Sequence, residues 1–308
     1  MSCYLKKRCK FISHSYPPSC ISRHPFLGIW SIDDYNAGVV RTQRLPDADR
    51  LSVLAATILL AYLSTRFVNL PPRELSLQLP GLYFAMPISI RTVVSLLVAG
   101  LTATGADWLL RDHPAMTGRS TFQHWLLPAL TAWVIGVPLY QLPFGVQWFI
   151  ALLAGGALLM LVLVAEYIVV DPEDVRHAPA TASLTAVSFA LYLILAITLR
   201  SAGVRLLFIL PALTLSACLV CLRTLHLRLG GRWIILPTVL LGLIVAQLTA
   251  TLHYWPIPPT AFGLALLGPA YAITSLIGGL SEGTPLQRAI VEPAVVLLIM
   301  WGAALWTS

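Results

Sequence analysis

The sequence predicts an all-α fold, a polytopic transmembrane bundle of about nine helices. Of its 308 residues, 57% are hydrophobic and only 11% are charged, whereas an average soluble domain has roughly 25% charged residues. From Leu51 onward, apolar runs near 20 residues long recur, which is the length a helix needs to cross about 30 Å of hydrocarbon. The alternation of a membrane β-barrel, in segments of about ten residues, is absent. Lipid is therefore the expected solvent for most of the surface.

Residues 1–49 differ from the rest and are expected to form a polar, basic and poorly ordered tail. They begin with Lys6, Lys7, Arg8 and Lys10, as the first part of a signal peptide does. The apolar segment that a signal peptide requires does not follow, so this interpretation is rejected. The cysteine and histidine spacings of the tail match no zinc finger. Residues 50–308 then make up the transmembrane helical domain.

Short polar breaks divide the transmembrane domain into its expected spans. Pro71-Pro72 stops the first, and Asp171-Pro172 ends the fourth. Ser120-Thr121-Phe122-Gln123 resembles a capping box that opens the third, and Gly230-Gly231 precedes the seventh. The expected spans are 51–68, 88–110, 121–140, 146–170, 178–199, 204–223, 233–252, 258–280 and 287–307.

The distribution of basic residues predicts the orientation in the membrane. With the N-terminus inside, 15 of the 20 Lys and Arg residues lie on the inner side and 5 on the outer side. Eight of the inner ones lie in the first fifty residues, so the bias depends heavily on the tail. Excess Lys and Arg mark the cytoplasmic side. We expect a multi-pass protein of the cell membrane with its N-terminus cytoplasmic and its C-terminus outside.

Several classes of partner are disfavoured. The net charge of +7 does not form a basic stripe with interleaved aromatics, so no nucleic acid is expected. Cys218-x-x-Cys221 lies inside an apolar run and is interpreted as packing. Phosphate loops, a nucleophile elbow, HExxH and paired-aspartate motifs are missing. We expect no cofactor and no metal; the expected partners are the lipid bilayer and a lipid, ion or small-molecule ligand.

Asp107 is the carboxylate that the length of its span constrains most. Only 15 uncharged residues separate it from Arg91, or about 22 Å of helix, so one or both groups must lie at or inside the membrane boundary. The long side chain of Arg91 can extend to the interface, whereas the short side chain of Asp107 cannot. Gly100, Thr104, Asp107 and Arg111 share one helical face, and its small residues predict packing against other helices.

His124, Glu166 and Glu292 are expected to join Asp107 in one polar layer. The spacing places His124 about one turn into the third span and leaves Glu166 about one turn before the end of the fourth. Glu292 is either embedded in the ninth span or its N-cap, with Pro293 as the first helical residue. Alternation along the bundle puts all four residues on one side of the membrane. Arg111 is expected just outside this layer.

Three functions stay open at this point. A binding or transport protein would use Asp107, His124 and Glu166 for a cation, a proton or a polar lipid head group. A membrane enzyme acting on a lipid or isoprenoid would use a carboxylate or His124 as general base. In a structural subunit, Asp107 would pair with Arg111 and Glu166 with a basic residue of a neighbouring span.

The sequence also offers two coarser signals. Leu-Pro-Ala-Leu-Thr occurs at 127–131 and again at 210–214, which suggests an inverted three-helix repeat of the kind found in transporters. The segments TGADWLLRDHP at 104–114, QHWLLPALTAW at 123–133 and AEYIVVDPED at 165–174 resemble an uncharacterised family of polytopic bacterial membrane proteins over residues 51–308. The resemblance implies a bacterial inner membrane and transfers no activity or catalytic residue.

Overall fold

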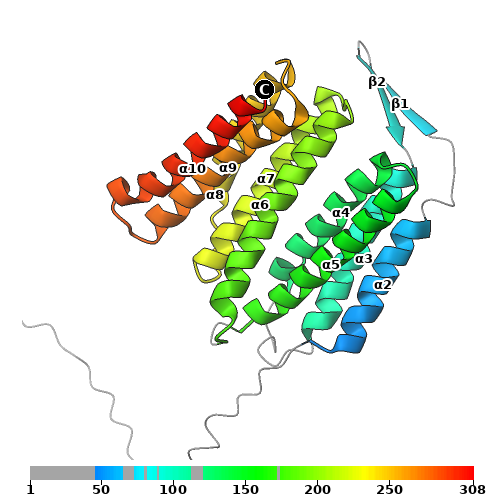
Figure 1. Ribbon diagram of the computed structural model, residues 1–308, viewed down its shortest axis with the longest axis horizontal. Helices are drawn as coiled ribbons and strands as arrows, with labels where there is room; N and C mark the ends of the chain where they lie inside the picture. Colours follow the sequence, from blue (N-terminus) through cyan, green and yellow to red (C-terminus); the bar gives the residue numbers. More distant parts are fainter. Residues whose placement is uncertain (1–45, 65–72, 80–81, 89, 112–120, 172–173) are drawn as a thin grey trace, which may run out of the picture. The chain divides into compact units, whose positions relative to one another are not determined.

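The computed structural model describes residues 46–64, 73–79, 82–88, 90–111, 121–171 and 174–308 (Figure 1). Most of the predicted tail, and the Pro71-Pro72 break, lie outside these residues. Within the described part of the chain, nine α-helices correspond one by one to the nine expected spans. They are α2 (Ala48–Ser64), α3 (Ile90–Arg111), α4 (Leu126–Gln141), α5 (Val146–Val169), α6 (His177–Ser201), α7 (Leu206–Arg228), α8 (Ile235–His253), α9 (Pro259–Ser281) and α10 (Leu286–Trp306).

Seven of these helices are long and apolar enough to cross a membrane, namely α3 and α5 to α10. Helix α4 is also apolar but has only 16 residues. The all-α transmembrane bundle predicted from composition is therefore confirmed, and the chain is a multi-pass membrane protein. The orientation of its termini stays a prediction.

A β-hairpin between α2 and α3 is the element that our sequence analysis missed. Strands β1 (Arg73–Leu79) and β2 (Leu82–Ile88) pair antiparallel, with Arg73 opposite Ile88 and Leu79 opposite Leu82. The first strand reads RELSLQL, in which apolar and polar residues alternate as in a strand. Pro80-Gly81 between the strands is a turn signal. Strands of seven residues are much shorter than the apolar runs near 20 residues that predict the helices, so they do not appear in that pattern.

Glycines mark two features of the helices. After α7, the chain turns through Gly230 and Gly231, whose φ angles of 60° and 91° lie in the left-handed region that glycine favours. This turn ends α7 at Arg228, beyond the predicted end of the span at 223. Inside the bundle, a Cβ added to Gly155 would lie 2.6 Å from Cγ2 of Ile135. The missing side chain therefore lets α4 and α5 approach closely, as is common between membrane helices.

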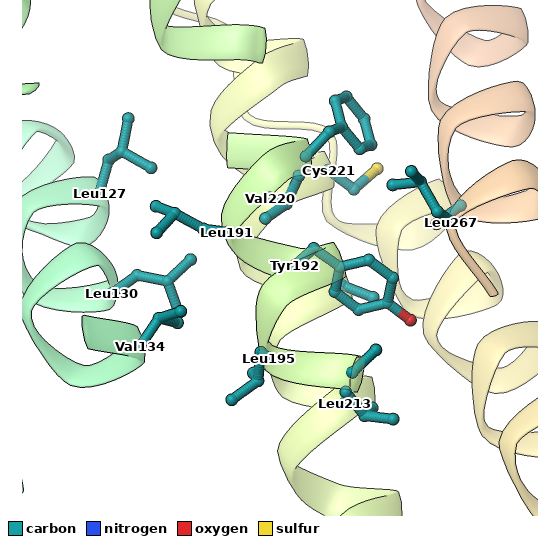
Figure 2. Close-up of a cluster of buried hydrophobic side chains, with 14 of the residues drawn as sticks. Leu127, Leu130, Val134, Leu191, Tyr192, Leu195, Leu213, Val220, Cys221 and Leu267 are labelled. Atoms are coloured by element: carbon teal, nitrogen blue, oxygen red, sulfur yellow. The ribbon is translucent and has the colours of Figure 1, made fainter. Parts of the chain in front are cut away.

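The core consists of two clusters of buried apolar side chains. One joins α2 to α5 and includes Ile58, Leu110 and Trp148. The other joins α4 to α9. In this second cluster, Leu130 and Val134 of α4 face Leu191 and Leu195 of α6 (Figure 2). The clusters share α4 and α5, so these two helices connect the halves of the bundle.

Consecutive helices run in opposite directions, so one end of the bundle collects alternate helix termini. Contacts between Asp107 and Thr121, between Glu166 and Arg223, and between Arg228 and Glu282 all lie there. We call this the Glu166 end. At the opposite end, Arg200 donates hydrogen bonds to the carbonyls of His253 and Trp255. The ends of α3, α5, α7 and α9 thus share the Glu166 end with the starts of α4, α6 and α10.

Candidate functional site

Glu166, His124 and Arg223 form a buried ionic cluster at the Glu166 end. Their residues are only 1%, 4% and 1% exposed, respectively. Arg223 donates from Nε to Oε1 of Glu166 at 3.1 Å and from Nη2 to Oε2. Nδ1 of His124 lies 2.7 Å from Oε2 of the same carboxylate. Both carboxylate oxygens are therefore engaged, in the forked geometry that makes arginine–carboxylate pairs strong.

The contacts of His124 extend to two further side chains. Its Nε2 lies 3.2 Å from Nε2 of Gln123, and its Nδ1 lies 3.3 Å from Nη2 of Arg223. Nη1 of Arg223 is buried and has no hydrogen-bond partner among the described residues. The cluster therefore ties α5, α7 and the start of α4 together.

Arg223 is the member of this cluster that our sequence analysis did not place in the polar layer. It was counted only among the basic residues of the inner side. The structural hypothesis did predict that Glu166 would pair with a basic residue of a neighbouring span, and Arg223 is that residue. Its position at the end of an apolar run, on the same predicted side as Glu166, was the available signal.

The structure places His124 before α4 and not one turn inside it. His124 lies in the 3₁₀ turn Phe122–His124, and α4 begins at Leu126 after an N-cap at Trp125 that makes no side-chain capping bond. The predicted capping box is therefore wrong. Instead of capping α4, the hydroxyl of Thr121 donates a hydrogen bond to Oδ1 of Asp107.

Asp107 lies near the 3₁₀ turn that contains His124, but its ion-pair partner is Arg111 and not Arg223. Its Oδ2 is 2.6 Å from Nη2 of Arg111, as the i,i+4 spacing predicts. The side chain of Asp107 is 12% exposed, whereas that of Arg111 is 72% exposed. The predicted packing of the whole face was wrong, because Gly100 and Thr104 are exposed. The sequence pattern identified small residues, but small residues do not by themselves show which face meets a neighbour.

Glu292 contacts a different part of the bundle. The interpretation as an N-cap is wrong, because α10 begins at Leu286 and Pro293 lies inside it. The exposed Glu292 accepts a hydrogen bond of 2.7 Å from the hydroxyl of Tyr271 on α9. Of the residues predicted for the layer, the structure thus brings His124 and Glu166 into contact. Asp107 is linked to their turn through Thr121, and Glu292 is linked to α9.

A groove of about 730 Å³ lies between α6 and α10. Helix α9, which packs against both of them, contributes Leu267, Tyr271, Thr274 and Ser275 to its lining. On α6, the lining includes Ala178, Ala182 and Ala186, which recur every four residues and are all exposed. The groove is therefore open along the side of the bundle, where lipid is the expected solvent.

The lining of the groove changes from polar to apolar along its length. At the Glu166 end it includes His177, Arg228 and Glu282. Farther in, it includes Phe189, Leu267 and Met300. His177 and Phe189 are twelve residues apart on α6, which corresponds to about 18 Å at roughly 1.5 Å per residue. This arrangement suits a molecule with a polar head and an apolar chain.

The polar mouth of the groove holds an arginine with few partners. Nε of Arg228 lies 3.6 Å from Oε1 of Glu282, and the two side chains are 34% and 40% exposed. The guanidinium lies over Gly278 of α9, where an added Cβ would be 2.8 Å from Nη1. Thr224, one turn earlier on α7, lines the groove with a buried hydroxyl that has no partner among the described residues.

In the described part of the chain, no three or more His, Cys, Asp or Glu side chains gather in a way that could hold a metal ion. The charged groups of the cluster and the groove pair with one another instead.

Comparison with known proteins supplies a family. Residues 70–307 match the model of a family described as "Protein of unknown function (DUF5656)". No curated protein and no solved structure matches the chain. The match extends over nearly all of the helical domain, and it agrees with the predicted resemblance to an uncharacterised family without an assigned activity. The chain belongs to the DUF5656 family.

Proposed function

We propose that this protein is a membrane-embedded binding protein that holds an amphipathic, lipid-like molecule in the groove between α6 and α10. The observation that carries the proposal is the graded lining of a laterally open groove of about 730 Å³. Small-molecule sites have volumes of roughly 300–1,000 Å³ and are mostly apolar, with a few placed polar groups. The groove matches both properties, and its open side gives a lipid direct entry from the bilayer.

The ionic cluster supports this site from behind. Helix α7 carries Arg223, which pairs with Glu166, and next to it Thr224, which lines the groove. Removing one partner of a buried charge pair strongly destabilises a protein, because the other charge is left uncompensated. The pair is therefore suited to hold the last turns of α7, and with them Thr224 and Arg228, in a fixed position. By the predicted orientation, the mouth of the groove faces the cytoplasmic interface.

The enzyme hypothesis receives less support from the same geometry. Its expected base is a carboxylate or His124. His124 contacts Glu166 and Gln123, and neither His124 nor the predicted carboxylates Asp107, Glu166 and Glu292 are among the residues that line the groove. A molecule in the groove would therefore lie away from the group expected to take its proton. A binding function needs no such group.

Native mass spectrometry of the purified full-length protein tests the proposal. Ala182→Trp places an indole in the groove, whereas Ala190→Trp, at an exposed position of α6 outside the lining, is the matched control. We expect the wild type and the control to retain a bound lipid through purification. Ala182→Trp should reduce the retained fraction by roughly tenfold, equivalent to about 1.4 kcal/mol. Equal retention by Ala182→Trp and wild type would reject the proposal.

A further inference from the structure

The mouth of the groove has the composition of an anion site. Its arginine, Arg228, makes no hydrogen bond to another described residue, and the nearest carboxylate is 3.6 Å from its Nε. Arginine is the side chain best suited to bind phosphate, because its planar fork donates several hydrogen bonds at once. Since its contact with a described carboxylate is this partly exposed ion pair with Glu282, the guanidinium at the polar end of the apolar groove is available to a ligand.

Thr224 provides an independent observation of the same kind. The residue is 2% exposed, and its Oγ1 has no hydrogen-bond partner among the described residues. A buried hydroxyl without a partner costs free energy. Because Thr224 lines the groove one turn from Arg228, a ligand oxygen bound at Arg228 lies within reach of this hydroxyl.

The remaining groups at the mouth either attract an anion or compete with it for Arg228. Helix α6 begins at His177 on the opposite wall, so the positive end of its macrodipole lies at this mouth, where the carboxylate of Asp174 accepts a hydrogen bond from the backbone N–H of Arg176. Glu282 is the carboxylate at this mouth and competes with an anion for Arg228. The phenol of Tyr271 is engaged by Glu292. Arg228 and the N-terminus of α6 therefore meet at the mouth, and among the lining residues that the structure describes the opposing carboxylate is Glu282, whose side chain is 40% exposed.

We propose that the groove selects lipids with a phosphate in the head group, which Arg228 and Thr224 bind while the acyl chain lies along Phe189, Leu267 and Met300. This inference rests on the proposed lipid-binding function and specifies the class of lipid. It also distinguishes a phospholipid from free phosphate, because the apolar part of the groove contributes only when a chain is attached.

The test compares two lipids that differ only in the phosphate. The full-length protein in detergent is titrated with dioleoylphosphatidic acid and with dioleoylglycerol, and inorganic phosphate is added as a competitor. Wild type should bind the phosphatidic acid at least tenfold more tightly than the glyceride. Arg228→Gln should bind the two lipids equally, and Arg228→Lys should recover part of the preference. Arg288→Gln removes a positive charge near the start of α10, outside the lining, and should leave the preference unchanged.

Thr224→Val separates ligand binding from folding. The substitution keeps the shape of the side chain and removes a hydroxyl that has no partner among the residues that the structure describes, so thermal stability should be unchanged or higher. The preference for phosphatidic acid should nevertheless fall several-fold. A preference that survives both Thr224→Val and Arg228→Gln would overturn the proposed contacts.

The remaining outcomes identify what has failed. Equal binding of both lipids by wild type would overturn the phosphate inference and leave the lipid groove standing. No binding of either lipid would overturn the groove as a lipid site, and this inference with it. Displacement of phosphatidic acid by millimolar inorganic phosphate would overturn the assignment to a lipid head group.

Discussion

Glu166 on α5 and Arg223 on α7 lie 57 residues apart in the sequence and form a buried ion pair through both carboxylate oxygens. His124, which precedes α4, adds a third contact to the same carboxylate. In a medium of low dielectric constant, each of these groups would be costly alone. Their mutual pairing is therefore both the reason that they are tolerated and a constraint on the relative positions of three helices.

Glu166→Gln should destabilise the protein strongly. The amide keeps the shape of the side chain but leaves the charge of Arg223 uncompensated inside the bundle. Breaking a buried pair in this way costs about 3–5 kcal/mol, measured as the free energy of unfolding in mixed micelles. The double variant Glu166→Gln, Arg223→Met should recover much of that loss, because no uncompensated charge is left. A loss below about 1 kcal/mol in the single variant would contradict this account of the cluster.

Asp107→Asn should lower the free energy of unfolding much less than Glu166→Gln does, although Asp107 and Glu166 are both carboxylates at the Glu166 end. The partner of Asp107 is Arg111, whose side chain is 72% exposed, and exposed pairs contribute roughly 0–1 kcal/mol. The amide oxygen of the variant still accepts the hydrogen bond of Thr121. The same unfolding experiment checks the expectation, and a loss as large as that of Glu166→Gln would show that Asp107 belongs to the buried cluster energetically.

Replacing either of two glycines of α3 by alanine should change the stability of the protein, but in opposite directions. A Cβ at Gly105 would lie 2.1 Å from Cδ1 of Leu54, whereas a Cβ at Gly100 meets no atom within 4 Å. Gly105→Ala should therefore cost about 1–3 kcal/mol through overpacking against α2. Gly100→Ala should gain about 0.5–1 kcal/mol from helix propensity. Equal melting temperatures for the two variants would show that α2 and α3 do not pack as described.

Glu282→Gln should tighten the binding of phosphatidic acid. The carboxylate is the competitor of the ligand for Arg228, and an exposed pair of this kind contributes roughly 0–1 kcal/mol, so a gain of up to about fivefold is expected. Lipid titration measures it, with Glu292→Gln as a control that removes the same charge from α10. Weaker binding after Glu282→Gln would mean that Glu282 contacts the ligand favourably.

The positions of the helices could be predicted from the sequence because hydropathy and turn residues determine them directly. The breaks at Asp171-Pro172 and Gly230-Gly231 both separate helices in the structure. Alternation of the helices also predicts that His124 and Glu166 lie on one side, and in the structure Nδ1 of His124 contacts Oε2 of Glu166. The hairpin of β1 and β2 was missed because its strands are only seven residues long.

The lateral arrangement of the helices could not be predicted in the same way. Apolar residues are equally suited to lipid and to a protein neighbour, so the pattern of α3 did not reveal that Gly105 is packed and Gly100 exposed. The groove depends on the spacing of α6 and α10 over α9, which no local pattern encodes. Its residues, including Thr224 and Arg228, are unremarkable in the sequence and become a candidate site only when four helices bring them together.

Photo-crosslinking with a lipid that carries a diazirine on its acyl chain tests the central claim most directly. The account predicts that the labelled peptides, mapped by mass spectrometry, concentrate on the groove segments around Ala182, Ala186 and Met300. Excess unlabelled phosphatidic acid should remove this labelling. The exposed face of α8, with Leu236, Leu240 and Leu243 at 72%, 53% and 57% exposure, should be labelled weakly and without competition. Labelling of α8 equal to that of the groove, undiminished by competitor, would contradict the proposed binding site.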